Sequence, residues 1–162
     1  MSISVRVATP EDASELAAIL NEIIAVGGTT AYEDPVDAAY IIHNCFERAE
    51  AICCHAALDA EGRIAGFQYI AWNDKLPVGW ADIATFARLT DKVPGAGRAL
   101  FAATRAAAAE AGATGINATI RADNTGGLTY YGKMGFEDFG VTQGVPLNDG
   151  TPVDRIHKRL AL

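Results

Sequence analysis

The chain has few cysteines and no long hydrophobic run. Its three cysteines, Cys45, Cys53 and Cys54, are odd in number and two are adjacent, which excludes a disulfide framework and fits no zinc-binding spacing. No apolar stretch is long enough to cross a bilayer, and the first residues lack the basic and apolar segments of a secretion signal. We therefore expect a soluble, cytoplasmic protein without a membrane partner, whose cysteines act as small buried hydrophobic residues.

Basic residues are also scarce. Lysine and arginine number 13 against 20 aspartates and glutamates, which gives a formal net charge of −7 at pH 7. This balance argues against a nucleic-acid partner, because such binding relies on neutralising phosphates. Half of the residues are hydrophobic, so the chain can bury a substantial core, and its length predicts a single domain over residues 1–162.

Hydrophobic patterns divide the chain into alternating strands and helices. Helices are predicted from residue 10 to about 24, from 34 to about 47, from the Gly95–Gly97 pair to 112, and from 124 to 134. The predicted strands span 2–8, 51–58, 64–72, 79–89, 114–120, 136–141 and 153–162. Antiparallel strands followed by a strand–helix–strand–helix–strand half indicate a mixed sheet of the α/β (α+β) class.

A glycine-containing loop between a predicted strand and a predicted helix is a candidate anion site. Gly95 and Gly97 open the alanine-rich helix, where unpaired N–H groups and the helix dipole favour negative charge. Glycine also lets the backbone approach a phosphate without a Cβ in the way. The loop lacks both the G-x-x-x-x-G-K-[ST] and the G-x-G-x-x-G patterns, which argues against the nucleotide-binding proteins that carry them. The glycines and the helix start predict a cradle for a phosphate or pyrophosphate group.

Two motifs together resemble the GCN5-related N-acetyltransferase (GNAT) family. Lys92, Gly95 and Gly97 fit Q/R-x-x-G-x-G/A, the acyl-CoA pyrophosphate loop of that family, with lysine in place of the usual arginine or glutamine. Residues 124–136 resemble the segment N-x-x-A/G-x-x-x-Y-x-x-x-G-F in register. Weaker similarities to the phosphinothricin acetyltransferase-like subgroup lie at Asn21, Thr29, Thr30, the Trp72–Trp80 turn and residues 153–156.

The resemblance implies a mostly antiparallel central sheet of six to seven strands with helices on both faces. It implies acetyl-CoA as the acyl donor, no metal, a small amine or amino-acid-like acceptor, and a homodimer. Pro94 lacks an N–H group, so we expect the cosubstrate to be held less tightly than is usual. The implied cofactor-binding residues are Thr85, Phe86, Ala87, Lys92, Val93, Pro94, Gly95, Ala96, Gly97, Arg98, Asn124, Gly127 and Tyr131.

The resemblance also implies catalytic roles. Tyr131 occupies the family's tyrosine position and is the expected general acid, because a phenol with a pKa of about 10 can protonate a departing thiolate. Packing on the sheet is the alternative, which suits Tyr130 better. Asp82 is the candidate base, since a carboxylate within the apolar run 81–84 is costly to bury without a function; an edge-facing or ion-paired aspartate is the alternative.

Residues Tyr32 and Glu33 lie in the loop after the first predicted helix, which borders the acceptor site in the family. They are the candidate acceptor contacts, with Glu33 as the second choice of base and a solvated loop as the alternative. Asn124 is expected to contact the cofactor or to cap its helix. We therefore predict a small-molecule N-acetyltransferase. A protein or peptide N-acetyltransferase and a non-catalytic acyl-CoA-binding module stay open as alternatives.

Overall fold

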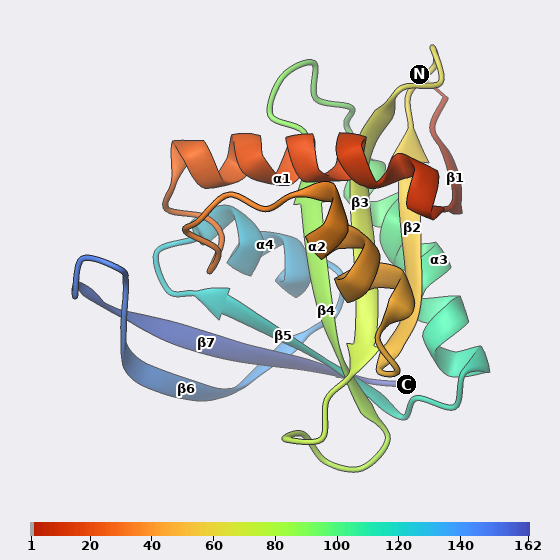
Figure 1. Ribbon diagram of the computed structural model, residues 1–162. Coiled ribbons are helices and arrows are strands. Elements are labelled where there is room, and N and C mark those ends of the chain that lie inside the picture. Colours follow the sequence, from red (N-terminus) through yellow and green to blue (C-terminus); the bar gives the residue numbers. More distant parts are fainter. Residues whose placement is uncertain (1) are drawn as a thin grey trace.

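The computed structural model describes residues 2–162, which fold into seven strands and four α-helices (Figure 1). A 3₁₀ turn precedes α1 and a π-helical turn, His43–Glu47, follows α2. Among residues 2–162, no helix is both long and apolar enough to traverse a membrane. The elements are β1 (Ser4–Val7), α1 (Ala13–Val26), α2 (Ala38–Ile42), β2 (Ala51–Leu58), β3 (Ile64–Trp72), β4 (Trp80–Ala87), α3 (Ala96–Glu110), β5 (Gly115–Arg121), α4 (Thr125–Lys133), β6 (Glu137–Pro146) and β7 (Pro152–Ala161).

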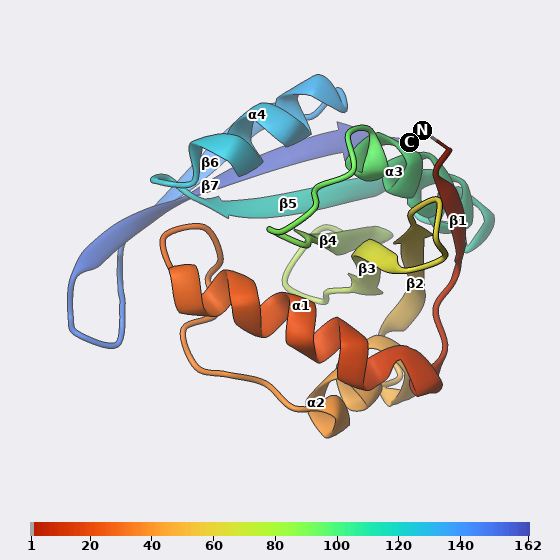
Figure 2. The ribbon, with the colours of Figure 1, turned by 90° about the horizontal axis from the view of Figure 1, so that it is seen from above.

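The seven strands form one sheet in the order β1-β2-β3-β4-β5-β7-β6. Every neighbouring pair is antiparallel except β4 and β5, which run parallel. Helices α1 and α2 cover one face of the sheet, and α3 and α4 cover the other (Figure 2). The predicted mixed, mostly antiparallel sheet with helices on both faces is therefore confirmed.

Two predicted boundaries are wrong by four residues or more. Helix α2 begins at Ala38 rather than at residue 34, because Asp37 caps it and accepts a hydrogen bond of 2.8 Å from the Tyr40 N–H. Val36 just before it exchanges two hydrogen bonds of 2.8 Å with the Asn21 side chain, which keeps this segment extended. Strand β6 continues to Pro146 rather than ending at residue 141. It lies at the sheet edge and shows little alternation of buried residues, so the sequence pattern did not reveal its full length.

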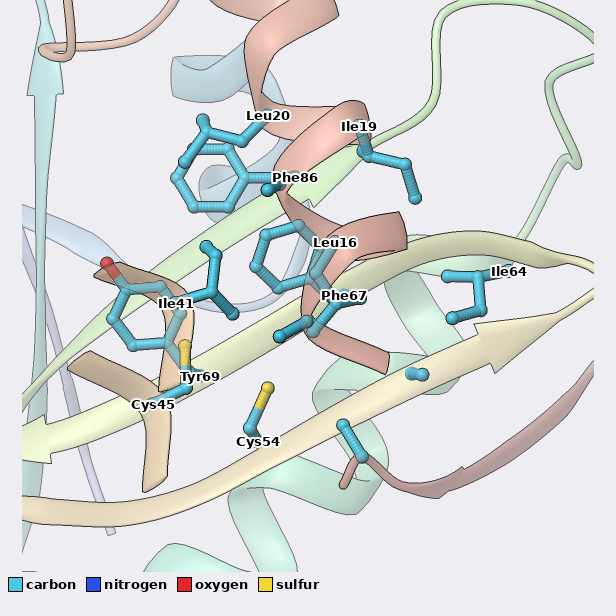
Figure 3. Close-up of a cluster of buried hydrophobic side chains, with 14 of the residues drawn as sticks. Leu16, Ile19, Leu20, Ile41, Cys45, Cys54, Ile64, Phe67, Tyr69 and Phe86 are labelled. Carbon is cyan, nitrogen blue, oxygen red and sulfur yellow. The ribbon is translucent and has the colours of Figure 1, made fainter. Parts of the chain in front are cut away.

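The core beneath α1 and α2 follows the predicted periodicity. Leu16 and Leu20 of α1 pack on the aromatic rings of Phe67 and Phe86 (Figure 3). Their spacing of four residues places them on one helix face. Two of the cysteines, Cys45 and Cys54, are buried in the same cluster, whereas Cys53 is half-buried, and all three are free thiols. Burial of this face fixes the position of β3 and β4, which carry much of the candidate site.

Candidate functional site

The central feature of the site is a gap between the two parallel strands β4 and β5. They pair only at Trp80–Gly115, Ala81–Ile116 and Asp82–Asn117, after which the strands diverge (Figure 1). On their outer sides β4 stays paired with β3 through residue 87, and β5 with β7 through residue 121. The two edges that face the gap therefore carry backbone N–H and C=O groups without a strand partner.

The predicted anion site lies at the start of α3. Gly95 is the residue before the helix and has a φ of +86°, a left-handed conformation that favours glycine. The side chains of Val93 and Ala96 are buried against Leu100, so only their main chain can face a ligand. Lys92, Pro94 and Arg98 are exposed in the same segment. The helix start thus offers N–H groups flanked by two exposed cations.

An ion pair anchors the loop that leads to this helix start. The Arg88 guanidinium donates to the Asp59 carboxylate over 2.9 Å and to the Asp91 carbonyl over 2.8 Å. Asp91 has a φ of 50°, which is uncommon for a residue other than glycine. Because Arg88 holds the carbonyl of this strained residue, the loop after β4 has a defined path before any ligand binds.

Gly97 has a second reason to be glycine. A Cβ at this position would lie 2.7 Å from Cε1 of Tyr130, so the tyrosine ring occupies the space that a side chain would need. The Tyr130 hydroxyl also donates a hydrogen bond of 2.7 Å to the Gly97 carbonyl. Packing on the sheet was the role expected for Tyr130, and the structure adds a polar contact between α4 and the start of α3.

Tyr131 lies in the buried wall beside the unpaired part of β4. Its hydroxyl shares a hydrogen bond of 2.9 Å with Oγ1 of Thr85, and its ring packs edge-on against Phe136. Burial raises the pKa of Tyr131 above the ordinary value for a phenol. The group is therefore protonated at neutral and mildly alkaline pH, as an acid must be before it can donate a proton.

Gln68 is a buried polar residue that sequence reasoning missed. Its Nε2 donates to Oγ1 of Thr85 over 2.8 Å and to the Tyr130 hydroxyl over 3.1 Å. The signal was present, because Gln68 is the only strongly polar side chain in the apolar run 64–72. It connects the residues of β4 and α4 that border the gap.

Asp82 lies on the face of the sheet opposite to Tyr131, at the last position where β4 pairs with β5. Residues alternate along a strand, so Asp82 shares the α1/α2 side with Phe86, whereas Thr85 shares the α3/α4 side with Ile83. The Asp82 carboxylate accepts one hydrogen bond of 2.5 Å from the Asn73 amide and one of 2.5 Å from the Asn117 amide.

Asp82 is half-buried and makes no ion pair among residues 2–162, so the ion-paired alternative is wrong. The carboxylate borders a cavity of about 790 Å³ between the π-helical turn and the β3–β4 turn. Trp80, His43 and Arg48 also line this cavity. A carboxylate with one amide donor on each oxygen thus borders a space of small-molecule size.

The predicted acceptor residues line a separate cavity. Tyr32 and Glu33 border a space of about 680 Å³ together with Tyr40 and Asn148. Neither residue lies in a merely solvated loop: the Tyr32 hydroxyl is 2.7 Å from that of Tyr40, and the Glu33 carboxylate accepts from the Asn148 N–H over 3.0 Å. The structure does not bring Tyr32 or Glu33 to the cavity that Asp82 lines.

Asn124 caps α4, as one of its two predicted roles required. Its Oδ1 accepts from the Gly127 N–H over 2.9 Å, and its Nδ2 donates to the Thr29 carbonyl over 2.6 Å. A Cβ at Gly127 would lie 2.5 Å from Nδ2, so the cap needs glycine there. Arg121 adds a hydrogen bond to the Thr30 carbonyl, and together these contacts tie the α1–α2 loop to the end of β5 and the start of α4.

The remaining predicted cofactor residues differ in exposure. Phe86 is buried in the core against Phe67, so only its main chain can face the gap, whereas the Ala87 side chain is exposed. This agrees with an expected contact through backbone groups of residues 85–87 rather than through side chains.

Solved structures share this architecture over nearly their whole length. A GNAT-superfamily phosphinothricin acetyltransferase from Sinorhizobium meliloti, in complex with acetyl-CoA, has a TM-score of 0.86 and 19% identity, covering 100% of this chain and 89% of its own. A ribosomal-protein-alanine N-acetyltransferase from Brucella melitensis has a TM-score of 0.85 and 21% identity over 98% and 99% of the two chains. A GCN5-related N-acetyltransferase from Kribbella flavida has a TM-score of 0.83 and 21% identity over 99% and 98%.

No protein-family model and no curated protein sequence matches the chain. The structural likeness is therefore one of fold: the chain has the fold of the GCN5-related N-acetyltransferases, as the two sequence motifs predicted.

Proposed function

We propose that the chain is an acetyl-CoA-dependent N-acetyltransferase that transfers the acetyl group directly to a small amine. The observation that carries this proposal is the gap between β4 and β5. It combines an anion-binding helix start, a protonated phenol at Tyr131 and a carboxylate at Asp82 where strand pairing ends. The shared fold with a protein solved in complex with acetyl-CoA supports the same acyl donor.

Residues 92–98 would bind the diphosphate of the cosubstrate. The Ala96 N–H donates to the Val93 carbonyl over 3.2 Å, whereas the next two N–H groups of α3 have no backbone acceptor within residues 2–162. Lys92 and Arg98 add positive charge beside them. Thr85, Phe86 and Ala87 would hold the pantetheine arm through unpaired backbone groups along the gap. Bound there, acetyl-CoA supplies the acetyl group as a thioester. Asn124 and Gly127 contribute by setting the position of α4.

Asp82 would act as the base. Two amide donors orient its oxygens, so the carboxylate can accept a proton from the acceptor's ammonium group. The neutral nitrogen then forms the C–N bond as the C–S bond of the thioester breaks. The remaining excess proton on nitrogen leaves to solvent as the amide forms.

Tyr131 would act as the acid. Its hydroxyl proton passes to the departing sulfur, and the phenolate regains a proton from solvent after the product leaves. Because burial raises the pKa of the phenol, it is protonated and ready to donate at neutral pH.

The acceptor is proposed to be a small amine, because the cavity beside Asp82 has a volume of about 790 Å³, within the range of small-molecule sites. Tyr32 and Glu33 are proposed acceptor contacts in the separate cavity of about 680 Å³ that they line. A homodimer and a cytoplasmic location stay predictions.

The proposal is tested by thiol release from acetyl-CoA with a panel of small amines, amino acids and short peptides. We expect turnover with small amines. Turnover with peptides alone would contradict the small-amine acceptor. Saturable acetyl-CoA binding without turnover of any acceptor would favour a non-catalytic acyl-CoA-binding module.

Calorimetric binding of acetyl-CoA tests the loop separately. Lys92→Glu should weaken binding by about tenfold, because it places negative charge beside the diphosphate. Arg105→Glu makes the same change of charge at an exposed position further along α3 and should leave the affinity unchanged. Equal affinities for the two variants would show that the diphosphate lies elsewhere.

A further inference from the structure

A buried chain of hydrogen bonds joins the start of α3 to Tyr131. The Tyr130 hydroxyl donates to the Gly97 carbonyl over 2.7 Å, and Nε2 of Gln68 lies 3.1 Å from that same hydroxyl. Nε2 also lies 2.8 Å from Oγ1 of Thr85, which is 2.9 Å from the Tyr131 hydroxyl. The chain thus connects the proposed diphosphate loop with the proposed acid through one amide.

We propose that Gln68 is a positioning residue: its amide fixes the direction of these hydrogen bonds so that the Tyr131 proton points into the gap. The inference rests on the proposed function and adds a residue to it. Gln68 is fully buried and lies in β3, so it acts on the reaction only through Thr85, Tyr130 and Tyr131.

The direction follows from the number of protons available. An amide nitrogen can only donate, so both Tyr130 and Thr85 accept from Gln68. The single hydroxyl proton of Tyr130 is then directed to the Gly97 carbonyl. The opposite orientation of the amide would set its oxygen against the Tyr130 hydroxyl, whose one proton is already used.

The same count applies at Thr85. Its oxygen accepts from Gln68, and the Tyr131 hydroxyl is the other group within hydrogen-bond distance of it. If the Thr85 hydroxyl donates to Tyr131, the Tyr131 proton is the one left without an acceptor in this chain of contacts. If Tyr131 donated instead, the Thr85 proton would be the one left over. The proposal requires the first arrangement, because a general acid needs its own proton free for the departing group.

A further observation indicates that this glutamine is kept for a function. Its Oε1 is buried without a hydrogen-bond partner among residues 2–162. An unpaired buried acceptor costs stability, and an apolar side chain of similar size would avoid that cost in the surrounding apolar layer. The two hydrogen bonds that Gln68 donates must therefore contribute more than the unpaired oxygen costs.

Two substitutions separate positioning from packing. Gln68→Met keeps an unbranched side chain of similar length and removes both donors, so kcat should fall at least tenfold while the KM and Kd for acetyl-CoA change less than threefold. Gln68→Glu keeps the shape but accepts where Gln68 donates, which draws the Thr85 proton away from Tyr131. It should lower kcat more than Gln68→Met does.

Thr104→Val is the matched control. Thr104 is fully buried in α3 and its hydroxyl is also unpartnered, but it lies outside the chain of hydrogen bonds. Its kcat should stay within twofold of wild type. Thr85→Val removes the hydroxyl that lies between Gln68 and Tyr131, and it should reproduce the kcat loss of Gln68→Met. This variant keeps the inference testable if a Gln68 variant fails to fold.

The outcomes are distinct. A folded Gln68→Met with wild-type kcat overturns the inference, and so does a wild-type kcat in Thr85→Val. Equal losses of kcat and of acetyl-CoA affinity would indicate a packing role and overturn it too. A wild-type protein that turns over no amine contradicts the proposed function itself and removes the basis of this inference with it.

Discussion

The two faces of the sheet differ sharply at the gap between β4 and β5. On the α3/α4 face, Tyr131 and Gln68 are buried in a chain of neutral donors and acceptors, and burial raises the pKa of the phenol. On the α1/α2 face, Asp82 is half-buried beside a cavity, and two amides donate to its carboxylate. One strand, β4, supplies residues to both environments because side chains alternate along it.

The difference places the proposed acid and the proposed base in separate environments. A buried phenol without a nearby cation stays protonated. The Asp82 carboxylate has one amide donor on each of its oxygens and borders a cavity. Each prediction below removes one side of this contrast or measures it.

The largest effect is expected from Asp82→Asn. Loss of the base should lower kcat by about 10²- to 10⁴-fold and flatten the acidic limb of the pH–rate profile, because no carboxylate remains to be protonated. Steady-state rates from pH 5 to 9 measure this change, with acetyl-CoA affinity as the control for folding. An unaltered acidic limb would assign the base to another group, with Glu33 as the next candidate.

A smaller effect is expected from Tyr131→Phe. The variant keeps the ring that packs on Phe136 and loses only the hydroxyl, so kcat should fall by about 10²-fold with acetyl-CoA affinity nearly unchanged. Tyr69→Phe, on the other face, removes a hydroxyl that lies 3.1 Å from that of Tyr32 and should leave kcat much less affected. Similar losses in the two variants would remove Tyr131 from the chemistry.

The smallest effect concerns stability at high pH. Because the folded-state pKa of Tyr131 is raised, the unfolded chain releases this proton first, at a pH of about 10. The contribution to stability is complete below that pH and declines as the pH rises above it. Tyr131→Phe should therefore lose less stability than wild type between pH 9.5 and 11, as measured by denaturant unfolding. Asp82→Asn, the control, should lose as much free energy of unfolding over this pH range as wild type. If Tyr131→Phe lost as much as wild type too, the phenol would not be desolvated in the folded state.

Periodicity predicted the parts of the fold that depend on burial. The pattern of Leu16 and Leu20 gave α1 its face. The hairpin turn at residues 59–62 identified the strands on either side of it, β2 and β3, to the residue. The sequence pattern failed at α2, where the Asp37 cap and contacts from Asn21 override the Asp-Pro start signal. It failed also at β6, whose residues are nearly all exposed and so leave no alternating signal.

The site was predictable only where its chemistry lies in motifs. Gly95, Gly97, Asn124 and Tyr131 were proposed from motif spacing, and their functional roles stay predictions. The gap between β4 and β5 depends on where strand pairing stops, which is a property of the backbone and leaves no side-chain pattern. The partners Asn73, Asn117 and Gln68 were missed because each is a single polar residue whose role depends on contacts far along the chain.

The most direct test of the central claim is a crystal structure with bound acetyl-CoA. The account predicts the diphosphate on the first N–H groups of α3, the thioester sulfur within hydrogen-bond distance of the Tyr131 hydroxyl, and the acetyl group turned towards the Asp82 side of β4. A cosubstrate that lies outside the gap, or a sulfur on the α1/α2 face away from Tyr131, would contradict the assignment of acid and base to opposite faces of the sheet.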